Sequence, residues 1–153
     1  FSLSRSLIEF EDIIKLINPA ENYKISELTD QCLAKNKNKT INILNENNSS
    51  FEENILIIKS FLYKLKRLKY LKKEMEVEKN QDQVISSYRP PIFWKDKELI
   101  KKQLKIWSLD EIKLLIKKIN NLELIIKKNS NLSNQILNNF IFEKLDISNN
   151  EIL

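Results

Sequence analysis

The chain has 153 residues and a formal charge of +5, a length that suits one domain with a buried core and argues against two independent cores. It contains no histidine and no glycine, which excludes an imidazole base, a histidine metal ligand and a glycine-rich phosphate loop. Its one cysteine, Cys32, excludes an internal disulfide and a cysteine zinc cluster. We therefore expect neither a metal site nor a cofactor.

The apolar runs of the chain are short. No stretch of eighteen apolar residues lacks charge, and the first residues do not join a basic segment to an apolar run with a cleavage site. We expect no membrane span, no secretory signal and a cytoplasmic location.

The positive charge is uneven: residues 1–53 carry a net charge of −3, and residues 54–153 carry +8. A basic region can attract nucleic acid. However, lysine, isoleucine and asparagine are all abundant here and share A/T-rich codons, so a biased genome produces the same excess without selection for binding.

Paired carboxylates are the only candidates for acid and base chemistry. Glu11 with Asp12, and Asp110 with Glu111, lie beside predicted helix starts, where carboxylates stabilise the helix macrodipole. We interpret them as structural and do not expect catalysis.

Apolar residues recur every three to four positions almost throughout, which predicts an all-α fold. The first helix is expected over residues 10–17, ended by Pro19, with a hinge at residues 18–22. Ser26 should cap a helix that runs to about Lys35. A short helix is then expected over residues 39–45.

Ser50 and Glu53 form a capping-box pattern that predicts a long helix to about residue 79. Its first half is apolar on more than one face, which indicates a central helix. Its second half is basic from Lys64 to Lys73. This basic stretch is either a solvated helix end or a phosphate contact.

The stretch YRPPIFWKDK, residues 88–97, is called the elbow below. It follows a short helix expected over residues 82–87. Pro90 and Pro91 lack amide donors and fix their backbone angles, so they end one helix and direct the next. We expect Ile92, Phe93 and Trp94 to pack into the structure beneath them, in the chain's own core or in an interface.

After the elbow, a helix is predicted over residues 95–107 with its apolar face ending at Trp107. Ser108 and Glu111 form a second capping box, which opens a helix to about residue 128. A favourable pair of Glu123 and Lys127 lies on that helix. Ser133 should start the last helix, before a polar tail. Its expected inward residues are Ile136, Leu137, Phe140, Ile141 and Leu145.

The elbow opens an ordered set of motifs. Arg89, Pro90 and Pro91 are followed by the run from Ile92 to Lys95, then by QLKIWS at residues 103–108, and then by a long helix with an acidic residue and a lysine near its end. Upstream lie IEFEDIIKLI and ISELTDQCLAKNKNKTINIL. In this order, over residues 7–145, the chain resembles the delta subunit of bacterial DNA polymerase III in its carboxyl-terminal region.

The resemblance implies a helical bundle that serves as the collar domain of a clamp-loader subunit, spanning residues 22–147. Residues 1–21 would be the end of the family's helical lid domain, and 148–153 a tail. Delta subunits belong to the AAA+ family but do not hydrolyse ATP, and their contact with the sliding clamp lies in an amino-terminal domain that this sequence lacks.

The implied task is oligomerisation during DNA replication, in the bacterial cytoplasm. The implied partners are the delta prime and gamma/tau subunits of the clamp loader, and DNA is met only within the assembly. The parent holoenzyme is a DNA-directed DNA polymerase, a nucleotidyltransferase, whereas this segment would carry no catalytic residue.

Two groups of residues follow as candidate sites. The first, for packing or interface contact, consists of Arg89, Pro90, Pro91, Phe93, Trp94, Gln103 and Trp107. The second, as candidates for facing DNA, consists of Lys66, Arg67, Lys127, Lys128 and Ser130.

A rival hypothesis comes from another class of protein. It is a free-standing basic helical module that binds nucleic acid through the stretch from Lys64 to Lys73 and the lysines of residues 101–128. Such a module should bind DNA on its own, with an affinity that falls steeply with salt.

Overall fold

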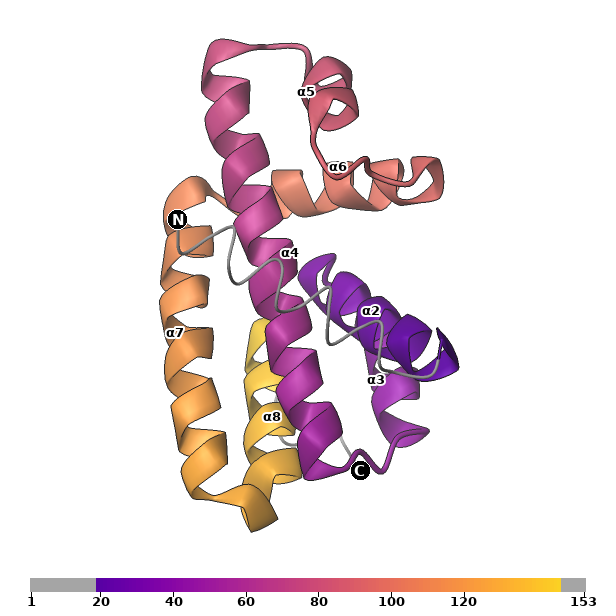
Figure 1. The fold of residues 1–153 in the computed structure, drawn as a ribbon, viewed down its shortest axis with the longest axis vertical. Coiled ribbons are helices and arrows are strands. Elements are labelled where there is room, and N and C mark those ends of the chain that lie inside the picture. Colours follow the sequence, from indigo (N-terminus) through magenta and orange to yellow (C-terminus); the bar gives the residue numbers. More distant parts are fainter. Residues whose placement is uncertain (1–18, 147–153) are drawn as a thin grey trace.

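The computed structural model of the chain describes residues 19–146. Within that range the chain forms seven α-helices and two 3₁₀ turns, with no strand (Figure 1). The predicted all-α class is therefore confirmed, and the arrangement is compatible with a helical bundle. The helix expected over residues 10–17, the pair Glu11 and Asp12, and the tail lie outside the described residues.

The long helix α4 (Phe51–Val77) is the centre of the fold, as its apolar pattern predicts. Its capping box is complete, because the Ser50 hydroxyl accepts from the Glu53 amide and the Glu53 carboxylate accepts from the Ser50 amide. Side chains on several of its faces are buried, among them Ile57, Ile58 and Phe61. It packs against α2 (Pro19–Leu33), α5 (Gln81–Ser87), α6 (Lys97–Ile106), α7 (Leu109–Lys128) and α8 (Ser133–Lys144).

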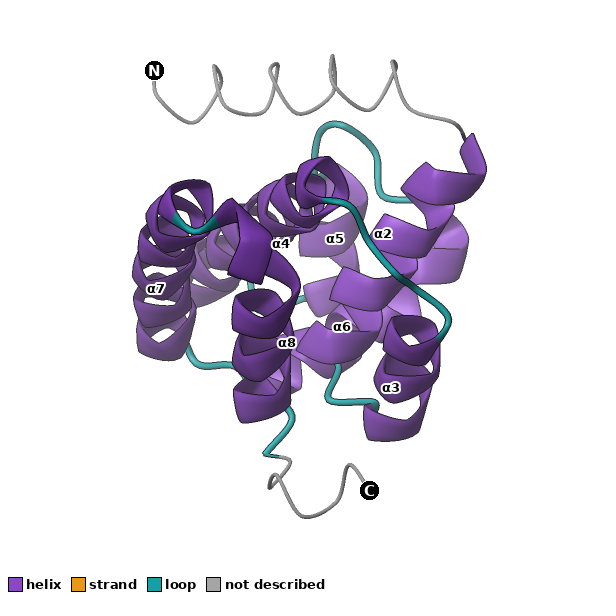
Figure 2. Ribbon diagram, turned by 90° about the horizontal axis from the view of Figure 1, so that it is seen from below, coloured by secondary structure: helices purple, strands orange, loops and turns teal. Residues whose placement is uncertain are grey.

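The other helices surround α4 in three groups. α7 and α8 lie along one side of it, while α2 and the short α3 (Lys37–Asn45) lie on the other (Figures 1 and 2). α5 and α6 cover the end where α4 finishes. An edge-to-face contact between Phe61 and Phe140, with ring centroids 6.0 Å apart, joins α4 to α8.

The predicted hinge at residues 18–22 is wrong from Pro19 onward. α2 begins at Pro19 and continues through Ser26 without a break. Proline fits the first turn of a helix, because its fixed φ is helical and the amide hydrogen it lacks would have no partner there. Ser26 therefore lies inside α2 and does not cap it.

Most helix ends agree with the sequence pattern to within a residue or two. α3 starts two residues earlier than predicted, and α5 starts at Gln81 with its Asn80 side chain as the cap. The helix predicted over residues 95–107 is divided into a 3₁₀ turn, η1 (Trp94–Asp96), and α6. The capping box of Ser108 and Glu111 is present, and a second 3₁₀ turn, η2 (Ser130–Leu132), precedes α8.

Candidate functional site: the elbow between α5 and α6

The elbow begins at a residue fixed in the core. Tyr88, the C-cap of α5, is buried, and its ring meets the edge of Tyr70 on α4 at a centroid distance of 5.5 Å. The Arg89 guanidinium turns back and donates to the backbone carbonyls of Ser86 and Tyr88, at 3.1 and 2.9 Å. Both bonds come from the same nitrogen, Nη1, so Arg89 holds the end of α5 with only part of its donor capacity.

The two aromatic residues after Ile92 point into solvent. Phe93 is 56% exposed and Trp94 is 68% exposed, so the expectation that they pack into the chain's own core is wrong. Ile92 alone takes the inward position, half-buried against the core. The chain then turns into η1, where the Asp96 amide donates to the Phe93 carbonyl at 3.0 Å. This turn directs the next two side chains outward.

Four apolar residues together make an exposed patch, which we call the elbow surface: Pro90, Pro91, Phe93 and Trp94. The two rings lie 5.8 Å apart at an interplanar angle of 50°. The Lys95 ammonium stands 5.4 Å from the Trp94 ring and 6.0 Å from the Phe93 ring, within cation–π range. The elbow surface can therefore contact an apolar or aromatic group through its rings and a negative charge through Lys95 at the same time.

Polar contacts brace the two helices on either side of the elbow. Lys101 of α6 forms an ion pair with Asp82 of α5 at 2.7 Å and with Glu98 at 2.9 Å. The hydrogen bond from Lys101 lowers the pKa of the Asp82 carboxyl below its ordinary value. The Lys97 ammonium donates to the Ser86 hydroxyl at 3.4 Å. The contacts from Lys101 to Asp82 and from Lys97 to Ser86 thus link α6 to α5.

Gln103 and Trp107 attach α6 to α2 rather than forming an exposed interface. Trp107 is buried, and its indole Nε1 donates to the Leu33 carbonyl at 2.7 Å. Gln103 is fully buried, and its Nε2 donates to the Asp30 carbonyl at 3.0 Å. The bond from Trp107 gives a partner to the carbonyl of Leu33, the last residue of α2, where a helix leaves its carbonyl groups without intrahelical partners. The Asp30 carbonyl also accepts from the Ala34 amide at 3.0 Å, so the bond from Gln103 is a second one to that carbonyl. These two residues position the elbow from inside.

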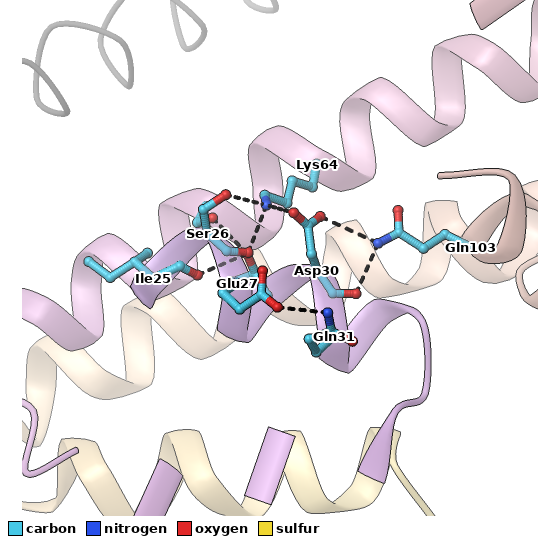
Figure 3. A network of polar contacts seen from close by, with 9 residues as sticks. Ile25, Ser26, Glu27, Asp30, Gln31, Lys64 and Gln103 are labelled. Carbon is cyan, nitrogen blue, oxygen red and sulfur yellow. Dashed lines mark hydrogen bonds and ion pairs between the residues drawn. The ribbon is translucent and has the colours of Figure 1, made fainter. Parts of the chain in front are cut away.

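A buried ion pair lies beside Gln103, between α2 and α4 (Figure 3). The Lys64 ammonium approaches the Asp30 carboxylate at 2.5 Å and donates to the carbonyl and the hydroxyl of Ser26, each at 2.8 Å. Burial lowers the pKa of Lys64, and the Asp30 charge opposes that shift in part. Because Lys64 is buried and paired, it is not available to a phosphate, which removes one cation from the basic stretch of the sequence.

The residues considered as DNA-facing fall into two groups, one on α4 and one where α7 ends. Lys66 and Arg67 are half-buried on α4, and Lys127, Lys128 and Ser130 are exposed at the far end of α7 (Figure 1). Lys127 shares a buried acid with another lysine: Lys59 and Lys127 both approach Oε1 of Glu123, at 2.9 and 2.8 Å. The predicted pair of Glu123 and Lys127 is thus present as part of a three-residue cluster.

Sequence reasoning missed the partners of these buried groups. Asp30 has no distinguishing pattern around it, and it lies 73 positions from Gln103. The burial of Lys64 was nevertheless indicated by the sequence, because the residues around it on α4 are apolar on more than one face. A lysine that is buried there needs an acidic partner.

Neither a metal cluster nor a membrane span is found in the described residues. Between residues 19 and 146, no three side chains of the metal-binding types gather closely enough to hold an ion. No helix in the same range is long and apolar enough to cross a membrane.

Comparison with known proteins gave no relative: no protein-family model, no curated protein and no solved structure matches the chain.

Proposed function

We propose that this chain is a non-catalytic assembly module, the collar domain of a clamp-loader delta subunit, and that the elbow surface docks against a neighbouring subunit. The family assignment rests on the sequence resemblance, with which the all-helical fold is compatible. The observation on which the proposal rests is the exposure of Phe93 and Trp94 on a segment that Tyr88 and Ile92 attach to the core. Large exposed aromatic residues commonly mark protein interfaces and often dominate their binding energy.

The rigidity of the elbow supports a docking role. Tyr88 at its start is buried, Ile92 at its middle packs against the core, and two prolines restrict the backbone between them. A surface that is already ordered loses little conformational freedom on binding, so more of its contact energy appears as affinity. Lys95 beside the rings favours a partner surface with an apolar centre and an acidic rim.

A second candidate function is contact with single-stranded nucleic acid at the same surface. Two exposed aromatic rings with a lysine ammonium over both are suited to base stacking beside a phosphate. The rival module that relies on the stretch from Lys64 to Lys73 is less well supported, because Lys64 is buried.

Mixing experiments with purified subunits test the proposal. The chain is run on a size-exclusion column with the collar regions of the delta prime and gamma/tau subunits of its own organism. A variant carrying Phe93→Ala and Trp94→Ala is compared with wild type and with Tyr23→Ala. Tyr23 is as exposed as Trp94, at 68%, but lies on α2, so it is a matched control.

We expect a complex with wild type and with Tyr23→Ala that survives moderate salt, and a weakened complex with the elbow variant. Anisotropy titrations of labelled single-stranded and duplex DNA at two salt concentrations are run in parallel. Tight, salt-sensitive DNA binding by the chain alone, with no subunit complex, would refute the collar hypothesis. Loss of such binding in the elbow variant would support the second candidate instead.

A further inference from the structure

A half-open groove lies between α2 and α3, which pack against each other (Figure 2). Its volume is about 390 Å³, within the range of pockets that bind small apolar groups. The residues that line it are Ala20, Tyr23, Lys24, Glu27, Ile43 and Glu46. We call it the α2–α3 groove.

The surface of the groove is mostly apolar. The Tyr23 side chain is largely exposed, and Ile43 packs only partly against the core. The buried side chains of α2, such as Ile25 and Leu28, belong to the core. Hollowed apolar surface that the core does not use commonly marks a contact site.

The charged residues of the groove carry a net negative charge. Two of the lining residues, Glu27 and Glu46, are acids, and one, Lys24, is a base, so the net charge is −1. The exposed neighbours Glu21 on α2 and Lys39 on α3 cancel each other and leave that charge unchanged. The groove therefore favours a positively charged partner.

The two carboxylates of the groove can still accept a cation. Glu27 accepts a hydrogen bond from Gln31 Nε2 through Oε1, at 2.8 Å, which uses part of its acceptor capacity. Within residues 19–146, neither Glu27 nor Glu46 forms an ion pair. An ammonium group that enters the groove would thus not displace an existing ion pair there.

The elbow has the opposite character. Its rings, Phe93 and Trp94, are exposed, and the Lys95 ammonium stands over both. The stretch YRPPIFWKDK contains three bases and one acid, a net charge of +2. An exposed pair of rings with positive charge therefore matches an apolar groove with negative charge.

We propose that the elbow surface of one copy of this chain inserts into the α2–α3 groove of a second copy. The inference rests on the proposed docking role of the elbow and names the surface that receives it. The two rings of the elbow meet Tyr23 and Ile43 of the second copy, where aromatic contact adds to apolar burial. The Lys95 ammonium approaches the carboxylates of Glu27 and Glu46.

The contact is head-to-tail, because it joins two different surfaces of the chain. The elbow surface and the α2–α3 groove share no residue, so each copy can use both at once and association can continue beyond a dimer. Two rings in one groove bury little area, so the contact belongs to the weak, transient class.

Sedimentation velocity of the whole chain over a range of concentrations, at moderate salt, tests this proposal. Wild type should associate as its concentration rises. The variant with Phe93→Ala and Trp94→Ala should associate at least tenfold more weakly, and so should Tyr23→Ala. Leu124→Ala, which removes a side chain that is 58% exposed on α7 and outside both surfaces, should not differ from wild type.

The decisive arm exchanges charges between the two surfaces. Lys95→Glu and Glu46→Lys each bring like charges together, so each variant alone should associate severalfold more weakly. In a mixture, the glutamate introduced at position 95 meets the lysine introduced at position 46, and the native Lys95 of one chain meets the native Glu46 of the other. The mixture should therefore recover association close to that of wild type. Both positions are exposed, and circular dichroism melts confirm that the variants remain folded.

The outcomes separate this inference from the proposed function. A chain that stays monomeric at the highest concentration, or a charge-exchanged mixture that recovers no association, would overturn the inference. Tyr23→Ala leaves the elbow surface intact, so its complex with the delta prime and gamma/tau collar regions tests elbow docking even where self-association is absent. Self-association that obeys the charge exchange, without any subunit complex, would support the inference and show that the proposed subunit partners are wrong.

Discussion

Lys64 and Asp30 form an ion pair in the interior of the protein, where an unpaired charge would lower stability. Their side chains are only 6% and 13% exposed, and the pair joins α2 to α4. Removing one partner of a buried pair leaves the other charge without compensation. The packing of α2 against α4 should therefore depend on both residues being present.

We predict that Lys64→Met lowers the free energy of unfolding by about 3 kcal/mol, because it leaves the Asp30 carboxylate unpaired. The double variant with Asp30→Asn should recover part of that loss. Urea unfolding of the three proteins measures both effects. Equal stability of Lys64→Met and wild type would contradict the buried pair.

Trp107 is the largest side chain that connects α6 to the core. We predict that Trp107→Ala lowers the free energy of unfolding by roughly 3 to 5 kcal/mol, as deletions of large buried aromatic residues do. Trp107→Phe should cost less but still more than a surface change, because the Leu33 carbonyl loses its donor. Urea melts with a loss below about 1 kcal/mol for the alanine variant would show that this indole is not core.

Glu123 should make stability depend on pH. Burial raises its pKa, but the ammonium groups of Lys127 and Lys59 outweigh that effect and hold the pKa below 4.5. The folded pKa is therefore lower than the unfolded one. Its contribution to stability is present above about pH 4.5 and is lost as the pH falls through the folded value.

Glu123→Gln should accordingly flatten the acid limb of the stability curve while costing stability at neutral pH. Urea melts between about pH 3 and pH 7 measure the slope for both proteins. Glu46→Gln, a change to a carboxylate on the α3 side of the molecule, serves as the control. An unchanged acid slope in Glu123→Gln would rule out this carboxylate as a source of the pH dependence.

At the scale of elements, helix positions were predictable where the signal is local. Capping boxes such as Ser50 with Glu53 act over three residues, and both examples form as predicted. The prediction at Pro19 is wrong because proline both ends a helix and begins one, and only the residues that follow decide between the two. Those residues continue α2, since its core contacts through Ile25 and Leu28 stabilise the helix.

The exposure of the elbow could not be predicted from composition. Phe93 and Trp94 are apolar, and periodicity shows that residues are apolar without showing which of them lie beneath a neighbouring element. Whether an aromatic side chain turns inward depends on the η1 turn and on Ile92, which fills the inward position first. The burial of Gln103 could not be predicted either, because its side chain is polar and the sequence does not show that α2 covers it.

We predict that replacing the elbow aromatics leaves the fold intact. The variant with Phe93→Ala and Trp94→Ala should unfold within about 1 kcal/mol of wild type, because neither ring is buried. Ile92→Ala should cost more, since its side chain packs against the core. Urea melts compare the two. A larger loss for the aromatic variant than for Ile92→Ala would mean that the rings support the fold after all.

At the scale of the whole molecule, the central place of α4 follows from its apolar faces, whereas the arrangement around it does not follow from any local pattern. α7 lies on one side of α4, and the elbow lies on the other, beyond α6 (Figure 1). The elbow surface and α7 thus lie on different sides of one hydrophobic core.

Trp94 provides the most direct test of the central proposal, that the elbow surface is a docking site. Acrylamide quenching is measured for the chain alone and with the delta prime and gamma/tau collar regions, and the signal that disappears in Trp94→Phe is assigned to Trp94. Complex formation should shift the emission of this exposed indole to the blue and protect it from quencher. A complex that forms while Trp94 stays as accessible as in the free chain would contradict the docking role of the elbow surface.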